Sequence, residues 1–318
     1  MQPAISCHGL SKSYGARPAV LGLDLEVAAG SVVGFLGPNG AGKTTVIRLL
    51  TTILAPDAGT FTVAGVPGSD PVGIRRRVGV LPESAGYPAN QTGEQVLRLH
   101  ARLCGQSRAQ ATRTARALLD QVGLGERGGH LVGGYSRGMR QRLGIARALV
   151  NSPAVIFLDE PTLGLDPAGQ RQVLALISTL SREHGATVLL CTHLLTEVEN
   201  ACDRVVVLNR GRVVAEGSVH EVAQAAAAPR EGRVHAPPGH RDAAVQTLLM
   251  LHQIQEAIAT EAPEEIRFTL REGVRPEDGA AAVLAALSAA GIPVLSFEVE
   301  RARLADAFLA ITAEGVPA

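Results

Sequence analysis

The sequence contains no apolar run that approaches the roughly 20 residues needed to cross a bilayer as a helix. Its N-terminus also lacks the charged segment followed by an apolar segment that marks a secretory signal. The four cysteines, Cys7, Cys104, Cys191 and Cys202, show no C-x-x-C spacing. These absences predict a chain that works in the reducing cytoplasm and serves a membrane only through another protein.

Neither sign of charge is in excess, because 30 basic residues balance 30 acidic residues. This balance gives no electrostatic reason to expect nucleic acid or anionic lipid as the main partner. Aromatic residues make up only 3% of the chain and apolar residues 46%, a composition typical of a globular protein, and the 318 residues suggest two domains. Lysine is scarce: apart from Lys12 and Lys43, the other 28 basic residues are arginine.

Lys43 lies in the segment 31–50, SVVGFLGPNGAGKTTVIRLL, around which the chain is organised. The apolar run 32–36 is typical of a strand buried on both faces. After Thr44, the apolar residues Val46, Leu49, Leu50 and Ile53 recur at helical spacing. The segment therefore predicts a strand, a tight turn and a helix, with the turn at the carboxyl edge of a sheet.

The turn contains the complete pattern G-x-x-x-x-G-K-[ST] and predicts a phosphate-binding loop. Its glycines let successive backbone N–H groups point into one concavity at the positive end of a helix. Lys43 would contact the β- and γ-phosphates, and the Thr44 hydroxyl would bind Mg²⁺. A glycine-rich surface turn is the alternative. The predicted ATP-binding residues of the loop are Gly37, Pro38, Asn39, Gly40, Ala41, Gly42, Lys43, Thr44 and Thr45.

The apolar run 154–158 and the segment 186–191 each predict a further buried strand, and polar residues follow both of them. Carboxylates at the end of a buried strand are costly unless a cation or a reacting proton needs them, and strand geometry directs neighbouring side chains to different sides. We therefore predict that Asp159 binds Mg²⁺ and that Glu160 activates the water that attacks the γ-phosphate. A solvated pair of strand-end carboxylates is the alternative. His193 follows the segment 186–191 and is predicted to sense the γ-phosphate.

The first 30 residues predict an antiparallel strand layer with one buried face, because Leu21, Leu23, Leu25 and Val27 alternate with polar or small residues. Tyr14 lies in a polar turn between strands of this layer. Taken alone, it is either an incidental turn residue or a flat surface on which a nucleotide base stacks.

From about residue 86 to 150 the spacing of apolar residues becomes helical, as at Val96, Leu97, Leu99 and Leu103, and predicts a helical insertion. The insertion closes with a segment in which Ser136, preceded by glycines, is a favourable N-cap. A second helix N-terminus is therefore available for an anion.

The order of these motifs resembles that of the ATP-binding cassette (ABC) ATPases over roughly residues 4–217. The loop 37–44 matches the Walker A motif, the strand that ends in Asp159 and Glu160 matches Walker B, and His193 matches the switch histidine. Asp166 falls in the D-loop, and Tyr14 matches the aromatic residue that stacks on adenine. The signature loop is formed by Ser136, Arg137, Gly138 and Met139. This variant is similar to that of ABC-2 exporters, including daunorubicin-type drug-resistance and antibiotic efflux systems.

Two positions depart from the general family pattern. Glu83 stands where the Q-loop glutamine is usual, which keeps an oxygen for the Mg²⁺ region but adds a charge. Arg137 replaces the first signature glycine, so a γ-phosphate contact there relies on Ser136 and the backbone N–H of Gly138.

The resemblance implies an ATPase that uses ATP and Mg²⁺ and works as a head-to-tail pair of cassettes, either identical or paralogous. Ser136 of one chain would contact the ATP bound by the other. A separate ABC-2 permease would hold the pair at the inner face of the cell membrane and select the substrate, a drug, antibiotic or lipid-like compound. Import is an alternative direction. A soluble ABC ATPase without a transport role is the other alternative, but the sequence shows neither the long coiled coil of DNA-repair cassettes nor the second cassette of translation factors.

The predicted fold class is α/β. A P-loop NTPase, with a RecA-like core, an antiparallel β layer and a helical subdomain, is expected over 1–218. A linker over 219–230 and a small α/β accessory domain over 231–318 follow. The accessory domain shows no nucleophile, metal cluster or phosphate loop, so no catalysis is expected there. It is either a passive cap or packs beside its twin to support pairing, because so small a layer would otherwise expose apolar surface.

Overall fold

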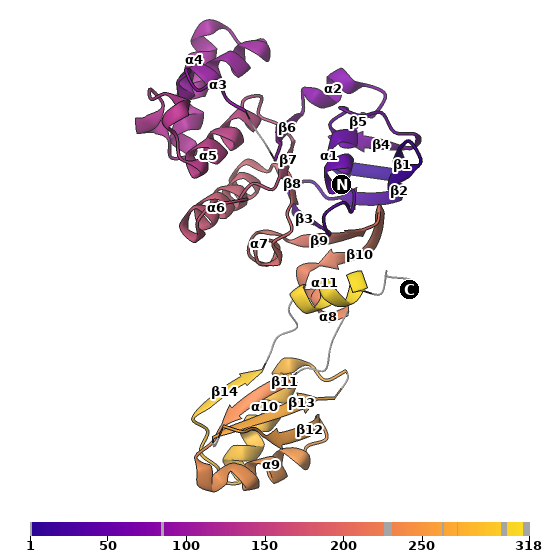
Figure 1. Cartoon of the computed structure of the whole chain (residues 1–318), viewed down its shortest axis with the longest axis vertical. Helices are drawn as coiled ribbons and strands as arrows, with labels where there is room; N and C mark the ends of the chain where they lie inside the picture. Colours follow the sequence, from indigo (N-terminus) through magenta and orange to yellow (C-terminus); the bar gives the residue numbers. More distant parts are fainter. Residues whose placement is uncertain are drawn as a thin grey trace. The chain divides into compact units, whose positions relative to one another are not determined.

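The computed structural model describes residues 2–83, 86–225, 231–262, 264–271, 273–299 and 304–313. The chain divides into two compact units, Met1–Val219 and His220–Ala318 (Figure 1). Helix α8 (Val219–Ala225) occupies the first part of the segment that the sequence assigned to a linker, so this part of the segment is helical. The rest of the predicted linker, 226–230, lies outside the described residues.

The first unit is built on a six-stranded sheet with the strand order β10-β9-β3-β8-β7-β6. Its strands are β3 (Val32–Leu36), β6 (Val78–Leu81), β7 (Val155–Asp159), β8 (Thr187–Cys191), β9 (Arg204–Asn209) and β10 (Arg212–Ser218). All pairs are parallel except the β9–β10 hairpin. Every residue of β3, β7 and β8 is buried, as expected for parallel strands covered on both faces. The carboxyl ends of the parallel strands therefore share one edge.

A second, antiparallel sheet has the order β2-β1-β4-β5. Its strands are β1 (Ile5–Tyr14), β2 (Arg17–Val27), β4 (Ala58–Val63) and β5 (Val66–Pro67). The predicted alternation in β2 holds from Leu23 onward but is wrong at Leu21, which is half-buried, whereas Val20 is fully buried. The pairing with β1 shifts its register between Val20 and Leu23, where Gly22 has a φ of 57°. This irregularity changes which side chains face the core.

Helix α1 (Lys43–Leu50) follows the glycine turn, as predicted, and packs with residues of both sheets in one core cluster (Figure 1). Its residues Val46, Leu49 and Leu50 are fully buried. The helix ends earlier than the apolar spacing suggested. The prediction that the helical spacing extends to Ile53 is wrong, because Ile53 lies beyond the end of α1 and is 64% exposed.

The helical insertion contains α3 (Gly93–Leu103), α4 (Arg108–Gln121) and α5 (Arg137–Ala148). Each helix begins at a hydroxyl N-cap, since the side chains of Thr92, Ser107 and Ser136 accept hydrogen bonds from the first turn. The helical spacing that includes Leu99 and Leu103 is confirmed, because both residues lie in α3, although they are 48% and 74% exposed. Leu99 lies two residues beyond the buried Leu97, a step of about 200° around the helix.

The remaining elements of the first unit connect these parts. They are α2 (Pro71–Arg75), η1 (Gly125–Arg127), η2 (Val132–Gly134), α6 (Pro167–His184) and α7 (Leu195–Ala201). Helix α7 follows β8 directly, so its first turn lies close to the edge of the sheet at which β8 ends. The first unit is thus a P-loop NTPase fold with an added antiparallel sheet and a helical insertion.

The second unit contains a four-stranded antiparallel sheet in the order β12-β13-β11-β14. In chain order its elements are β11 (Glu231–His235), η3 (Pro238–His240), α9 (Arg241–Leu249), β12 (Ile254–Ala259), β13 (Glu265–Leu270), α10 (Pro276–Ala289), β14 (Ser296–Val299) and α11 (Leu304–Ala313). This βαββαβ sequence with its strand order is a ferredoxin-like arrangement. Residues 300–303, between β14 and α11, lie outside the described residues.

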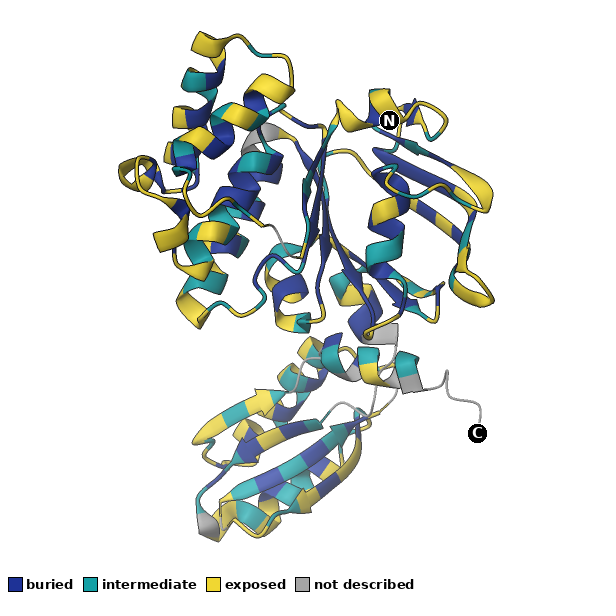
Figure 2. Cartoon of the chain, turned by 45° about the horizontal axis from the view of Figure 1, so that its top comes forward, coloured by how far each residue is buried: buried dark blue, intermediate teal, exposed yellow. Residues whose placement is uncertain are grey.

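Buried residues alternate with more accessible residues along strands of this second sheet (Figure 2). One face forms a core with helices α9 and α10, in which Val234 and Ile266 are fully buried. The other face carries charges, with Glu231 3.9 Å from Arg267 across two strands. Helices α9 and α10 thus cover the apolar face of this sheet, so that face does not require a twin, and the pairing of this unit with its twin stays a prediction.

Candidate functional site

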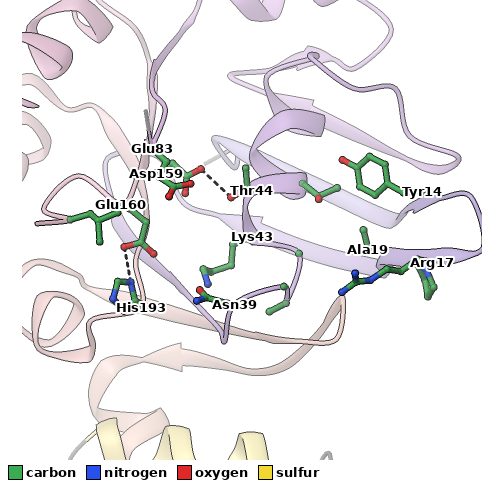
Figure 3. A pocket seen from close by; sticks show the side chains of 16 residues that line it. Tyr14, Arg17, Ala19, Asn39, Lys43, Thr44, Glu83, Asp159, Glu160 and His193 are labelled. Carbon is green, nitrogen blue, oxygen red and sulfur yellow. Dashed lines mark hydrogen bonds and ion pairs between the residues drawn. The ribbon is translucent and has the colours of Figure 1, made fainter. Parts of the chain in front are cut away.

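A pocket of about 560 Å³ opens at the carboxyl edge of the six-stranded sheet (Figure 3). It is lined by residues 39–45 of the P-loop, Tyr14 and residues 17–19 of the β1–β2 hairpin, Glu83, Asp159, Glu160, Leu163 and His193. The structure therefore places predicted residues from five separate segments in one pocket. Gly37 and Pro38 do not line it.

The P-loop has the tight backbone that its glycines predict. A Cβ atom at Gly37 would collide with the carbonyl oxygen of Leu208, and one at Gly42 would collide with that of Ala19. Gly42 also has a φ of 109°, a conformation that favours glycine. The loop is fixed to the β9–β10 turn, where the N–H of Gly211 donates to the carbonyl of Ala41 at 2.9 Å. Such a cradle fits a polyphosphate, which must approach the backbone closely.

Lys43 is buried beneath the loop, with 8% of its surface exposed. Its Nζ donates to the carbonyl oxygens of Gly37 at 2.5 Å and Pro38 at 3.3 Å. Among the described residues no carboxylate lies within ion-pair distance of this ammonium group. The charge of Lys43 therefore remains available to an anion in the loop.

Thr44 and Asp159 meet at the inner end of the pocket, where the Thr44 hydroxyl donates to Oδ2 of Asp159 at 3.1 Å. Burial raises the pKa of the Asp159 carboxyl; the hydrogen bond from Thr44 opposes this rise, and the charge of Glu83 adds to it. A divalent cation would relieve the repulsion between the two carboxylates. Within the described residues, however, no cluster of three acidic, histidine or cysteine side chains could hold a metal by itself. A cation here would need further oxygen ligands from phosphate or water.

Glu160 and His193 form a hydrogen-bonded pair, with 2.9 Å between Oε2 and Nδ1. They follow neighbouring strands, since Asp159 pairs with Cys191 and the N–H of Glu160 donates to the carbonyl of Cys191 at 2.8 Å. Burial raises the pKa of the Glu160 carboxyl, and the bond to His193 opposes the rise. The sequence predicted a role for each residue but not their contact, because it does not reveal that β7 and β8 are neighbours.

The predicted signature and D-loop residues lie together in a second pocket of about 350 Å³. It includes Ser136, Arg137, Gly138 and Asp166 and shares no lining residue with the first pocket. Met139 does not line it; its N–H donates to the Ser136 hydroxyl at 3.2 Å. The side chain of Asp166 caps α6 by accepting from the N–H of Gly169 at 2.9 Å. The structure therefore does not bring the signature residues to the P-loop of their own chain.

Arg137, which replaces the first signature glycine, makes a contact that the sequence did not indicate. Its guanidinium group occupies the space beside Gly164 of the D-loop, where even a Cβ atom would collide with it. Gly164 has a φ of 69°, which favours glycine. The side chain at position 137 thus packs against the D-loop and does not enter the first pocket.

Arg17 is a lining residue that sequence reasoning missed. It begins β2, and its side chain points from the hairpin towards the P-loop, with a guanidinium nitrogen 3.9 Å from the place that a Cβ on Gly40 would occupy (Figure 3). Nothing in the local sequence marks it, because an arginine at the start of an exposed strand is common on any surface.

We expect Arg17→Ala to weaken ATP binding about fivefold, since an exposed charge-assisted contact to phosphate contributes roughly 1 kcal/mol. The rate at saturating ATP should change little. Titration with a fluorescent ATP analogue measures the affinity, and Arg113→Ala, an exposed arginine on α4, is the matched control. Equal affinities of Arg17→Ala, the control and the unchanged protein would show that Arg17 makes no contact with the nucleotide.

A P-loop at the edge of a parallel sheet, with strand-end carboxylates beside it, defines a P-loop NTPase. The family model described as "ABC transporter" matches residues 20–163. The daunorubicin/doxorubicin resistance ATP-binding protein DrrA of Streptomyces peucetius is 39% identical over 315 residues, covering 97% of this chain and 92% of that protein. The chain therefore belongs to the ABC transporter family, as one of its ATP-binding proteins, and is an ATPase.

Two other similarities are limited to part of the chain. The methionine import ATP-binding protein MetN of Caulobacter vibrioides is 40% identical over 250 residues, covering 74% of this chain and 75% of that protein. A solved structure of an ATP-binding subunit of an ABC transporter is 31% identical with a TM-score of 0.63, covering 70% of this chain and 92% of that chain. The daunorubicin-resistance relative, in contrast, is similar over both units.

Proposed function

We propose that this protein is the ATP-hydrolysing subunit of an ABC-2 type exporter, which drives efflux of a drug, antibiotic or lipid-like compound through a separate membrane permease. The observation that carries the proposal is the similarity to a daunorubicin/doxorubicin resistance protein over 97% of the chain, including the second unit. The methionine import protein is similar over 74% only. This difference favours export over import.

The pocket supports specific roles for its residues. Tyr14 would stack on the base, and the P-loop with Lys43 would bind the phosphates. Thr44, Asp159 and Glu83 would hold Mg²⁺ together with phosphate and water oxygens. When bound, Mg²⁺ would neutralise part of the charge of the phosphates, whereas protein side chains would position the nucleotide and activate the attacking water.

Glu160 is proposed to act as the general base that orients and deprotonates the attacking water. Its raised pKa suits this role, because a carboxylate with a higher pKa is a stronger base. His193 holds Glu160 through the bond at 2.9 Å and also faces the pocket, from which it would contact the γ-phosphate. The two functions are compatible, because an imidazole has two ring nitrogens.

The second pocket supports a head-to-tail pair of cassettes. Ser136 and Gly138 present the N-terminus of α5 at a surface that is separate from their own nucleotide pocket. In a pair they would bind the phosphate held by the partner's P-loop, so each ATP site would contain residues of both chains. Closing and opening of the pair would pass the motion to the permease.

The permease is the partner that tests this proposal. None of the helices in the described part of the chain combines the length and the apolar character that a membrane crossing requires. We expect the full chain, purified from detergent-solubilised membranes, to bring with it a polytopic permease that mass spectrometry identifies. Cells that lack the chain should accumulate more of a fluorescent anthracycline, and Glu160→Gln should not restore efflux. A non-transport role would be indicated if no membrane protein co-purifies and accumulation is unchanged.

A further inference from the structure

Glu197 is the most buried charged side chain among the described residues, with 2% of its surface exposed. It lies in the first turn of α7, four residues after His193, and does not line the nucleotide pocket. A carboxyl group is costly to bury unless its oxygens are hydrogen-bonded. The burial of Glu197 therefore depends on its hydrogen-bond partners, neither of which lines the nucleotide pocket.

Both oxygens of Glu197 accept hydrogen bonds, and the two donors come from different loops. The hydroxyl of Thr162 donates to Oε1, and the hydroxyl of Thr192 donates to Oε2 at 2.8 Å. Both threonines are fully buried. Thr192 also accepts from the N–H of Leu194 at 3.0 Å, which fixes its hydroxyl towards the carboxylate. Glu197 thus joins two loops through buried, directional bonds.

These two loops carry the pair at the reacting end of the pocket. Thr162 lies two residues after Glu160, and Thr192 lies directly before His193. The ladder between β7 and β8 ends at Asp159 and Cys191. Beyond it the backbone N–H of Glu160 still donates to the carbonyl of Cys191 at 2.8 Å, but this bond does not fix the side chains of Glu160 and His193. Glu160 also has a φ of 50°, a conformation that a non-glycine residue keeps only when its surroundings hold it.

We propose that Glu197 is a positioning residue that holds the Glu160 loop and the His193 loop in register, so that the two side chains keep their 2.9 Å contact. The inference rests on the proposed roles of Glu160 and His193. Glu197 itself does not line the nucleotide pocket. Without its carboxylate, two buried hydroxyls lose their acceptor and the loops can shift by a fraction of an ångström, which is enough to disturb water activation.

Glu197→Ala should lower kcat about 10- to 100-fold and leave the affinity for ATP within about twofold of the unchanged protein. Glu197→Gln keeps the shape and one accepting oxygen, so its kcat should be intermediate. Both are measured on the full chain, with kcat and KM from steady-state hydrolysis and binding from fluorescent ATP titration. Ser181→Ala, which removes a buried hydroxyl bonded to Gly30 at 2.8 Å outside the pocket, is the control for a purely structural loss.

The threonines provide a second test that does not depend on whether Glu197→Ala folds. Thr192→Val and Thr162→Val should lower kcat, and Thr192→Ser and Thr162→Ser should restore it, because serine keeps the donating hydroxyl. In a His193→Ala background, Glu197→Gln should have a clearly smaller effect than alone, since both act through the same pair.

The inference would be overturned if Glu197→Ala and Glu197→Gln hydrolyse ATP at the unchanged rate, or if they lose ATP affinity in proportion to activity. It would also be overturned if valine and serine at position 192 behave alike. A wild-type chain that binds ATP but never hydrolyses it, with or without its permease, would instead contradict the proposed function.

Discussion

Glu160→Gln is expected to lower the rate of ATP hydrolysis by at least about 100-fold, because a general base contributes roughly 10²- to 10⁴-fold to proton transfer. The amide keeps the shape of the carboxyl group but cannot accept the proton of the attacking water. ATP binding should be retained, since Lys43, Thr44 and the P-loop backbone are unchanged. The variant should therefore accumulate an ATP-bound dimer. Single-turnover hydrolysis and size-exclusion chromatography with ATP measure these two effects.

The matched control is Glu216→Gln, an exposed glutamate on β10 outside the pocket, which should hydrolyse ATP normally. Unchanged turnover in Glu160→Gln would remove the assignment of Glu160 as the base. The pH profile gives an independent check. Because burial raises the pKa of Glu160 above its usual 4.5, the base is protonated, and hydrolysis falls, at a higher pH than for an ordinary glutamate.

An equal mixture of Ser136→Arg and Lys43→Ala chains is expected to hydrolyse ATP although each variant alone is nearly inactive. Lys43→Ala loses phosphate binding in its own P-loop, and Ser136→Arg blocks the signature surface that serves the partner. In a mixed dimer, the intact P-loop of one chain meets the intact Ser136 of the other. Random pairing makes half of the dimers mixed, each with one complete site of two, so about a quarter of the normal activity should return if the sites are independent.

Hydrolysis is measured by phosphate release before and after the two chains are mixed. In the control, Lys43→Ala chains are mixed with chains that carry both Ser136→Arg and Glu160→Gln. The one composite site of these mixed dimers lacks the base, so the control should stay inactive. If the first mixture shows no activity above either parent, composite sites do not form in trans or both must work together. If ATP is trapped in the control dimers, composite sites do form in trans, and the missing activity means that both sites must work together.

Local sequence was sufficient to predict an element wherever interactions between residues close in the chain determine that element. The P-loop was predictable because a buried strand, three glycines and a helical repeat lie within 20 consecutive residues. Ser136 was predictable as an N-cap for the same reason, since its hydroxyl bonds the N–H of Met139 only three residues away. Where the same local reasoning was extended to residues beyond a helix end, as at Ile53, it was wrong, because spacing alone does not show where a helix stops.

The sequence by itself thus determined the α/β class, the phosphate loop and the identity of the polar residues that follow the buried strands. Only the tertiary structure decided which of these residues meet. The Glu160–His193 contact joins residues 33 positions apart, and the bond from Thr162 to Glu197 joins residues 35 positions apart. Arg17 reaches the pocket from a different layer of the fold. Such contacts depend on strand order and on packing between layers, which arise from the whole chain and leave no periodic signal in any short stretch of it.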